Sequence, residues 1–237
     1  MMTRLASVAV AVTMLFGMSQ ASAHAEIDYG AGSGARVAAL PGAFSSPQAT
    51  MRQLQGRPCA PPNVCEPVTF ANYGSFLGGN MGLLSLNDGV AKLDHWIRTT
   101  PGRKIAFGAS LGASVVYKWL RLYSADATAP PPSELSFITD GAPERRGTGY
   151  VYSDPKGMYD YRKQEGFGIP AGTPYRVVDV CRKWDGWCYW IPGDQRSENG
   201  MNQLHIDYSQ IDVNDPANEV VVEGNVTYVL VPTPGWG

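Results

Sequence analysis

The 237-residue sequence is poor in charged residues, histidine and cysteine. Charged side chains make up 17% of the chain, with 19 Lys and Arg against 21 Asp and Glu, and no basic run offers the positive surface that nucleic acid requires. We therefore expect no nucleic-acid partner. The sequence has three histidines, and its four cysteines lack the C-x-x-C spacing of zinc sites, so we expect neither a metal nor a cofactor.

Long apolar runs are also lacking beyond the N-terminus. Arg4 precedes an apolar run of about 14 residues, which is shorter than the roughly 20 residues of a spanning helix. Small residues at positions 21–25 then form A-x-A cleavage sites. We interpret residues 1–23 as a secretory signal peptide whose cleavage leaves no stable transmembrane anchor. The mature chain, residues 24–237, is expected to be secreted or associated with the cell envelope.

The mature chain shows neither an internal repeat nor a Ser/Gly-rich linker, so a single domain is the simplest interpretation. Apolar residues recur at helical spacing in residues 85–99 and 111–123. Gly224-Asn225 is a turn signal that favours a terminal β-hairpin. Apolar runs of strand length occupy residues 35–40, 68–73, 104–107, 135–139, 175–180 and 220–230. Because strands and helices alternate, the sequence predicts an α/β fold with a mainly parallel central sheet flanked by helices.

The most informative segment is 104–114, which has the pattern strand, G-x-S-x-G turn, helix. This is the context of a nucleophile elbow, in which a tight turn lifts a serine hydroxyl clear of the sheet. Ser110 is the predicted nucleophile. The backbone N–H of Leu111, at the start of the following helix, is the predicted first donor to an oxyanion. The second donor is expected from the loop after the first strand, as the N–H of Ala43 or Phe44.

A serine nucleophile needs a base, and in this class of fold the acid and then the histidine follow the serine along the chain. His205 is the single histidine after Ser110 and is the predicted base, because His95 lies upstream in a predicted helix and His24 lies in the cleavage region. The candidate acids are the aspartates at positions 140, 154, 160, 179, 185 and 194, which all lie between Ser110 and His205.

The choice among these aspartates rests on the surrounding sequence. Export permits disulfides, and the two close cysteine pairs favour the local pairings Cys59–Cys65 and Cys181–Cys188. The second bridge would close a short loop around Asp185 and hold its carboxylate rigidly, as an acid that orients histidine requires. Asp185 is the predicted acid, while Asp140 and Asp179, at the end of one predicted strand and within another, stay open as alternatives.

A family resemblance is visible in these motifs. The pattern C-x3-D-x2-C at residues 181–188 resembles the disulfide-bound aspartate loop of cutinases. Other segments resemble the PE-PPE domain of mycobacteria and their relatives, a cutinase-related family of serine α/β-hydrolases. These are residues 107–110, 135–149, 179–185, 205–208 and 225–234. The resemblance implies a cutinase-like α/β-hydrolase fold.

The predicted activity is that of a secreted serine ester hydrolase acting on short acyl esters or lipids through an acyl-enzyme. The resemblance also implies an alternative, in which the same triad transfers an acyl group to a cell-envelope glycolipid. A third hypothesis is an inactive hydrolase fold that binds the envelope. Residues 150–174, with Met158 and Phe167, are expected either to cover the site as a flap or to form a surface loop. Aromatic residues around Asp185 are expected to line the cleft or to pack the loop, and they are Trp184, Trp187, Tyr189 and Trp190.

Overall fold

The computed structural model describes residues 25–73, 80–154, 157 and 166–236. The predicted signal peptide, together with His24, Met158 and Asp160, lies outside the described residues.

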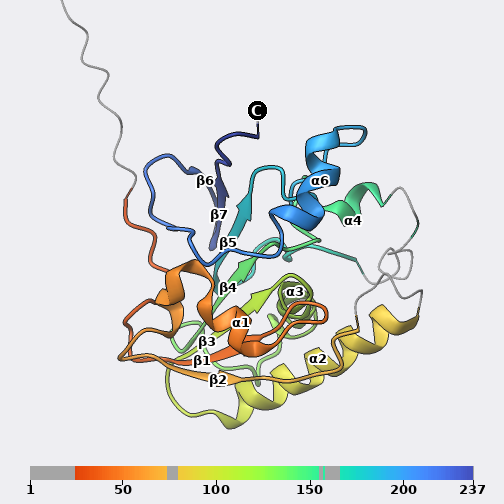
Figure 1. Ribbon diagram of the computed structural model, residues 1–237. Coiled ribbons are helices and arrows are strands. Elements are labelled where there is room, and N and C mark those ends of the chain that lie inside the picture. The colour runs from red at the N-terminus through yellow and green to blue at the C-terminus, as the bar shows by residue number, and fades with distance from the viewer. Residues whose placement is uncertain (1–24, 74–79, 155–156, 158–165, 237) are drawn as a thin grey trace, which may run out of the picture.

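A seven-stranded sheet, with strand order β2-β1-β3-β4-β5-β7-β6, runs through the described part of the chain (Figure 1). Neighbouring strands are parallel except for the antiparallel hairpin of β6 and β7, which is the hairpin expected from Gly224-Asn225. The strands are β1 (Arg36–Leu40), β2 (Val64–Pro67), β3 (Lys104–Ala109), β4 (Leu135–Asp140), β5 (Arg176–Arg182), β6 (Glu219–Glu223) and β7 (Val226–Val231). The predicted α/β-hydrolase fold class, with its mainly parallel sheet, is confirmed.

Two long helices, α2 and α3, pack against each other, and α3 packs directly on β3 and β4. In the chain α2 follows β2, and α3 follows β3 directly (Figure 1). The helix predicted at 111–123 has those limits, whereas the one predicted at 85–99 begins earlier, at Asn80. The helical elements are α1 (Pro47–Arg52), η1 (Leu54–Cys59), α2 (Asn80–Thr99), α3 (Leu111–Tyr123), α4 (Tyr150–Ser153) and α6 (Gln195–Gln203).

Buried strand residues alternate between two apolar clusters, as the two-residue period of a strand requires. One cluster joins the sheet to α2 and α3 and includes Ala38, Ala106, Phe137, Val177, Leu93 and Trp119. The other covers the opposite face with residues from η1 and from loops, and it includes Val37, Ile105, Ile138, Val178, Leu54 and Tyr208. The sheet is therefore buried on both sides, which explains the nearly continuous apolar strands in the sequence.

The strand predicted at residues 68–73 is wrong. The strand in this region is β2, at Val64–Pro67, and it pairs with β1. Phe70, in the predicted run, packs against the cluster between the sheet and the helices, close to Gly89 of α2. The apolar character of this run therefore arises from packing on a helix and not from a place in the sheet.

Parallel strands bring their carboxyl ends to one edge of the sheet, where α/β proteins bind their ligands. Here the segments that follow β1, β3, β4 and β5 meet at that edge. They contain Gly42, Ser110, Gly141 and Asp185 respectively, so the topology alone gathers most of the predicted site.

Candidate active site

Ser110 forms the sharp turn between β3 and α3. Its backbone has φ 52° and ψ −109°, a conformation that costs a non-glycine residue about 1–3 kcal/mol. The Ser110 N–H donates to the carbonyl of Asp140 on the neighbouring strand, at 2.8 Å. This strained turn is stabilised by the sheet and projects the hydroxyl beyond the strand ends.

The glycines on either side of Ser110 are required by close contacts. A Cβ on Gly108 would lie 2.4 Å from the carbonyl oxygen of Gly112, and a Cβ on Gly112 would lie 2.4 Å from the carbonyl oxygen of Leu40. Both distances are far below a van der Waals contact. The G-x-S-x-G pattern therefore allows the elbow to close on itself and α3 to approach the end of β1.

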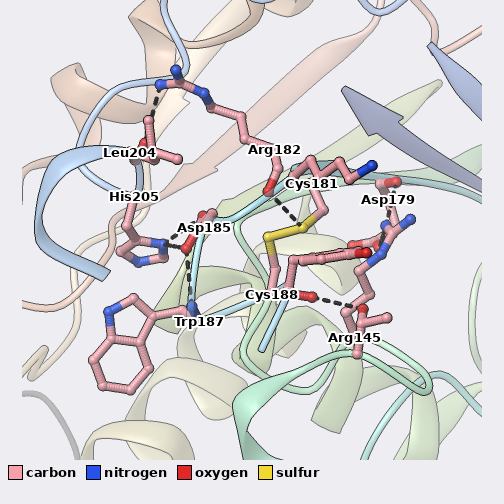
Figure 2. The surroundings of a disulfide bond; sticks show 12 residues. Arg145, Asp179, Cys181, Arg182, Asp185, Trp187, Cys188, Leu204 and His205 are labelled. Atoms are coloured by element: carbon pink, nitrogen blue, oxygen red, sulfur yellow. Dashed lines mark hydrogen bonds and ion pairs between the residues drawn. A yellow bond between two sulfur atoms is a disulfide. The ribbon is translucent and has the colours of Figure 1, made fainter. Parts of the chain in front are cut away.

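Ser110, His205 and Asp185 form a continuous hydrogen-bonded chain. The Ser110 Oγ lies 2.7 Å from His205 Nε2, and His205 Nδ1 lies 2.9 Å from Oδ2 and 3.0 Å from Oδ1 of Asp185. Figure 2 shows the Asp185 carboxylate facing the imidazole, beside the disulfide between Cys181 and Cys188. The three residues named from the sequence as nucleophile, base and acid are thus brought together.

The loop after β5 holds Asp185 in place. The Cys181–Cys188 disulfide closes this loop, and the Trp187 N–H donates to Asp185 Oδ1 at 3.0 Å. The Tyr208 hydroxyl donates to Oδ2. Asp185 is completely buried, and its carboxylate accepts hydrogen bonds from His205, Trp187 and Tyr208, which stabilise its negative charge away from water.

Helix α6 positions His205. Ser197 in this helix accepts from the Ile191 N–H at 3.1 Å and donates to the Tyr189 carbonyl at 3.3 Å, which fixes α6 to the segment that follows the acid loop. The helix ends at Gln203, and the His205 N–H then donates to the Gly200 carbonyl at 3.1 Å. Acid and base are therefore carried by two segments that are hydrogen-bonded to each other.

Asp179, one of the two alternative acids, does not contact His205. It forms a buried ion pair with Arg145 and accepts hydrogen bonds from the hydroxyls of Tyr117 and Thr139, each at 2.7 Å. In Figure 2 Asp179 and Arg145 lie together, on the far side of the disulfide from His205. These contacts give Asp179 a structural place inside the fold.

Asp140, the other alternative, ends β4 and lines the cavity in front of Ser110. Its side chain is buried, and Oδ2 has no hydrogen-bond partner within the described residues. Burial, reinforced by the charges of Asp185 and Asp179, raises the pKa of this carboxyl well above its ordinary value. Asp140 therefore differs from Asp185 in its hydrogen bonding: Oδ2 of Asp140 has no partner within the described residues, whereas the Asp185 carboxylate accepts hydrogen bonds from Trp187, His205 and Tyr208.

The other described aspartates and the histidine that were considered for the acid and the base have other places in the fold. Asp194 caps the N-terminus of α6 by accepting from the Arg196 N–H, and His95 is exposed on α2. Asp154 is buried at the end of α4.

The loop after β1 lies against the nucleophile, where a second oxyanion donor was expected. A Cβ on Gly42 would lie 3.2 Å from the Ser110 Cβ, so this loop borders the reacting hydroxyl. The Phe44 N–H, however, donates to the Asn72 carbonyl at 3.0 Å. This bond occupies one of the two N–H groups named from the sequence, so the N–H of Ala43 is the remaining candidate from this loop, and the N–H of Leu111 is the candidate from α3.

Asn72 was not identified from the sequence, although it fastens this loop. Its side-chain amide donates to the carbonyls of Gly42, at 3.0 Å, and of Ser45, at 2.8 Å. With the Phe44 bond, Asn72 makes three hydrogen bonds to residues 42–45. The sequence hints at this role only through the single amide side chain in the apolar run at 68–73. The composition of that run is typical of a strand, so the amide does not stand out.

A cavity of about 440 Å³ opens in front of Ser110 and His205. Of the four aromatic residues around Asp185, Trp187 lines this cavity, whereas Trp184 packs against Tyr189 and Trp190 packs against Tyr150. Apolar groups contributed by several elements form much of the wall, and they are Ala43, Phe44, Ala49, Leu111, Pro143 and Ile206. The described parts of the predicted flap include Tyr150 and Val151, which are buried near Phe167.

The described residues contain no group of three or more His, Cys, Asp and Glu side chains arranged to hold a metal ion. Within the same residues, no helix is both long enough and apolar enough to cross a membrane.

Comparison with known proteins gives one family match. A family model described as the PE-PPE domain matches residues 60–190, which is more than half of the chain and includes Ser110 and Asp185 but not His205. No curated protein matches the sequence.

Several solved structures are similar at low identity. An acetylxylan esterase has 16% identity and a TM-score of 0.43, with 73% of this chain and 96% of that chain covered. A cutinase-like protein from Cryptococcus sp. has 16% identity and a TM-score of 0.44, with coverages of 73% and 92%. The alpha/beta hydrolase domain-containing protein 10 from mouse has 15% identity and a TM-score of 0.41, with coverages of 83% and 79%.

Proposed function

The chain belongs to the PE-PPE domain family, and from this premise we propose that it is a serine hydrolase that cleaves carboxylic esters through an acyl-enzyme on Ser110. The observation that carries the proposal is the chain of hydrogen bonds from Ser110 Oγ through the His205 imidazole to the Asp185 carboxylate. A nucleophile, a base within reach of it and an acid that orients the base are the parts that this chemistry requires.

In the first half of the reaction, His205 Nε2 removes the hydroxyl proton as Ser110 Oγ attacks the ester carbonyl carbon. The carbonyl oxygen becomes an oxyanion, which the N–H groups of Leu111 and Ala43 stabilise. Asp185 keeps the Nδ1 proton of His205 in place, so that Nε2 is free to act as the base. The imidazolium then gives its proton to the departing alcohol oxygen, and the acyl group stays on Ser110.

In the second half, a water molecule attacks the acyl carbon while His205 Nε2 takes one of its protons. The carbon–oxygen bond to Ser110 then breaks, the imidazolium returns a proton to Ser110 Oγ, and a carboxylic acid leaves. An alcohol or sugar hydroxyl that replaced water would receive the acyl group through the same steps. We propose hydrolysis as the principal activity and acyl transfer to a cell-envelope glycolipid as its alternative outcome.

The substrate that we propose is an acyl ester with a short chain or a lipid acyl group. Support comes from the apolar wall of the cavity, to which Ala43, Leu111 and Ile206 contribute. We further propose that the protein is exported, with residues 1–23 removed as a signal peptide. Support for export comes from the two disulfides, which take up all four cysteines and persist in oxidising surroundings.

The test is hydrolysis of p-nitrophenyl esters of increasing chain length by the wild type and by Ser110→Ala. We expect the wild type to turn over and the variant to lose about 10⁶-fold in kcat while remaining folded. Activity of Ser110→Ala within about tenfold of the wild type contradicts the proposal. A folded wild type without activity on any ester favours the envelope-binding hypothesis. Added sugar acceptors that divert the acyl group from water would identify the acyltransferase.

A further inference from the structure

Tyr208 lies three residues after His205 and is buried beneath the site. Its hydroxyl donates to Asp185 Oδ2 and accepts from the backbone N–H of Arg182 at 3.0 Å. A tyrosine hydroxyl has one proton, so the bond to Arg182 fixes its direction and leaves that proton for Asp185. Tyr208 and His205 Nδ1 therefore share one oxygen of the same carboxylate.

The backbone of Tyr208 holds this arrangement from both sides. Its N–H donates to Gln53 Oε1 at 2.6 Å, and its carbonyl accepts from the Leu54 N–H at 3.0 Å. The loop that carries His205 is thereby fixed to the segment joining α1 to η1, and Gln53 also lines the cavity. The hydroxyl of Tyr208 consequently has little freedom to leave Asp185.

The charged groups around this contact come from three elements. From β4, Asp140 presents a buried carboxyl whose pKa is raised by burial and by the charges of Asp185 and Asp179. From the end of β5, the Arg182 guanidinium donates to the carbonyls of Leu204 and Asp207 in the histidine loop. From that loop itself, Asp207 is exposed, and its pKa is lowered by its hydrogen bond from the Ser209 N–H.

Burial and the charge of Asp185 raise the pKa of Tyr208 well above its ordinary value. The hydroxyl thus keeps its proton throughout the pH range in which a histidine titrates and acts there as a permanent donor.

We propose that Tyr208 is a positioning residue that tunes the proton affinity of His205 by sharing the charge of Asp185. The inference rests on the proposed function, because it assigns a role within the same triad. Each donor on a carboxylate withdraws part of the charge that would otherwise stabilise the imidazolium. Removal of the Tyr208 hydroxyl leaves more of that charge to His205, so the imidazolium becomes more stable.

The first test is Tyr208→Phe, with Tyr117→Phe as the matched control. Tyr117 is also fully buried, and its hydroxyl donates to an aspartate, Asp179, that lies away from the triad. In Tyr208→Phe we expect the acid limb of the pH profile of kcat/KM to move up by about 0.5–1 pH unit and kcat to fall about tenfold. Tyr117→Phe should lose stability to a similar degree without moving the limb.

A second variant covers the case in which Tyr208→Phe does not fold. Site-specific 3-fluorotyrosine at position 208 keeps the shape of the side chain but makes the hydroxyl a stronger donor. We expect the acid limb to move down, opposite to the change in Tyr208→Phe. A limb that stays within 0.2 pH unit (about the precision of such a profile) in the folded variants overturns the inference.

The titration of His205 can be followed without any substrate, by NMR of protein labelled with ¹³C-histidine, with the signal assigned by its loss in His205→Ala. We expect the midpoint to rise in Tyr208→Phe and to stay unchanged in Tyr117→Phe. An unchanged midpoint in Tyr208→Phe overturns the role of Tyr208 even if the wild type hydrolyses esters. If the wild type hydrolyses no ester, the proposed function fails, and this titration still decides whether Tyr208 tunes His205.

Discussion

Asp185 lies 20 residues before His205 in the chain and accepts a hydrogen bond from its Nδ1 at 2.9 Å. We predict that Asp185→Asn lowers kcat by about 10⁴-fold, because an amide at this position favours the wrong tautomer of the imidazole. Steady-state hydrolysis of a p-nitrophenyl ester measures the effect. Asp179→Asn is the control, and its turnover per folded molecule should stay within about tenfold of the wild type. Equal losses in the two variants would reject Asp185 as the acid.

Asn72 should contribute to turnover through the loop that it fastens. We predict that Asn72→Ala lowers kcat by about 10- to 100-fold and changes KM little, because a displaced Ala43 N–H stabilises the transition state less than before. The matched control is Asn63→Ala. Asn63 also fastens loops, by donating to the carbonyls of Gly30 and Pro58 and accepting from the Ala35 N–H, but it does so at the other end of β1. A similar fall in kcat for both variants would contradict the specific role of Asn72.

The parts of this fold that are predictable from sequence are those fixed by local contacts. The helix at 111–123 and the elbow before it are both encoded within a dozen residues, because Gly108 and Gly112 meet across a single turn. The Cys181–Cys188 loop is equally local, so the spacing of its cysteines favours Asp185 as the acid, although the sequence alone leaves Asp140 and Asp179 open. His205 can be named because it is the sole histidine after Ser110.

Other features are not predictable, because their partners are distant in the chain. Asn72 bonds to residues 27 and 30 positions away, and Tyr208 bonds to Asp185 across 23 positions. No spacing rule connects such pairs. The strand predicted at 68–73 is wrong for a related reason, since Phe70 packs on α2 and apolar character alone does not tell a helix contact from a strand.

The two disulfides should differ in their effect on catalysis. We predict that replacing Cys181 and Cys188 together by Ser lowers turnover at least about tenfold per folded molecule, because the loop that holds Asp185 is released. Replacing Cys59 and Cys65 together should leave turnover per folded molecule near that of the wild type, since this bridge joins η1 to β2 away from the cavity. Unfolding curves give the folded fraction of each variant. Equal turnover in the two double variants would contradict a role for the second bridge in holding the acid.

Stability should depend on pH through Asp140. Its pKa in the folded protein is raised above the ordinary value of 3.8 by burial and by the charges of Asp185 and Asp179. The folded state therefore holds this proton more tightly than the unfolded chain does. The resulting stabilisation is fully present below about pH 3.8 and is lost as the pH rises through the raised value. Asp140→Asn cannot ionise, so we predict that it is more stable than the wild type at pH 8 and that this advantage disappears near pH 4.

Urea unfolding at several pH values measures this dependence. Asp179→Asn serves as a comparison for Asp140→Asn, because it replaces a buried aspartate that has a charged partner. It leaves the buried Arg145 without that partner, so we expect it to lose about 3–5 kcal/mol in the free energy of unfolding. If the free energy of unfolding of the wild type and of Asp140→Asn changed in parallel between about pH 4 and pH 8, Asp140 would not titrate in that range, which would contradict the prediction.

The most direct test of Ser110 as an activated nucleophile is covalent labelling with a fluorophosphonate probe, followed by mass-spectrometric mapping of the modified residue. A serine activated by a neighbouring base attacks such a probe, whereas an ordinary surface serine does not. We predict that the wild type is labelled on Ser110, that Ser110→Ala is not labelled, and that His205→Ala is labelled far more slowly. A folded wild type that stays unlabelled, or a label on any residue other than Ser110, would contradict this prediction.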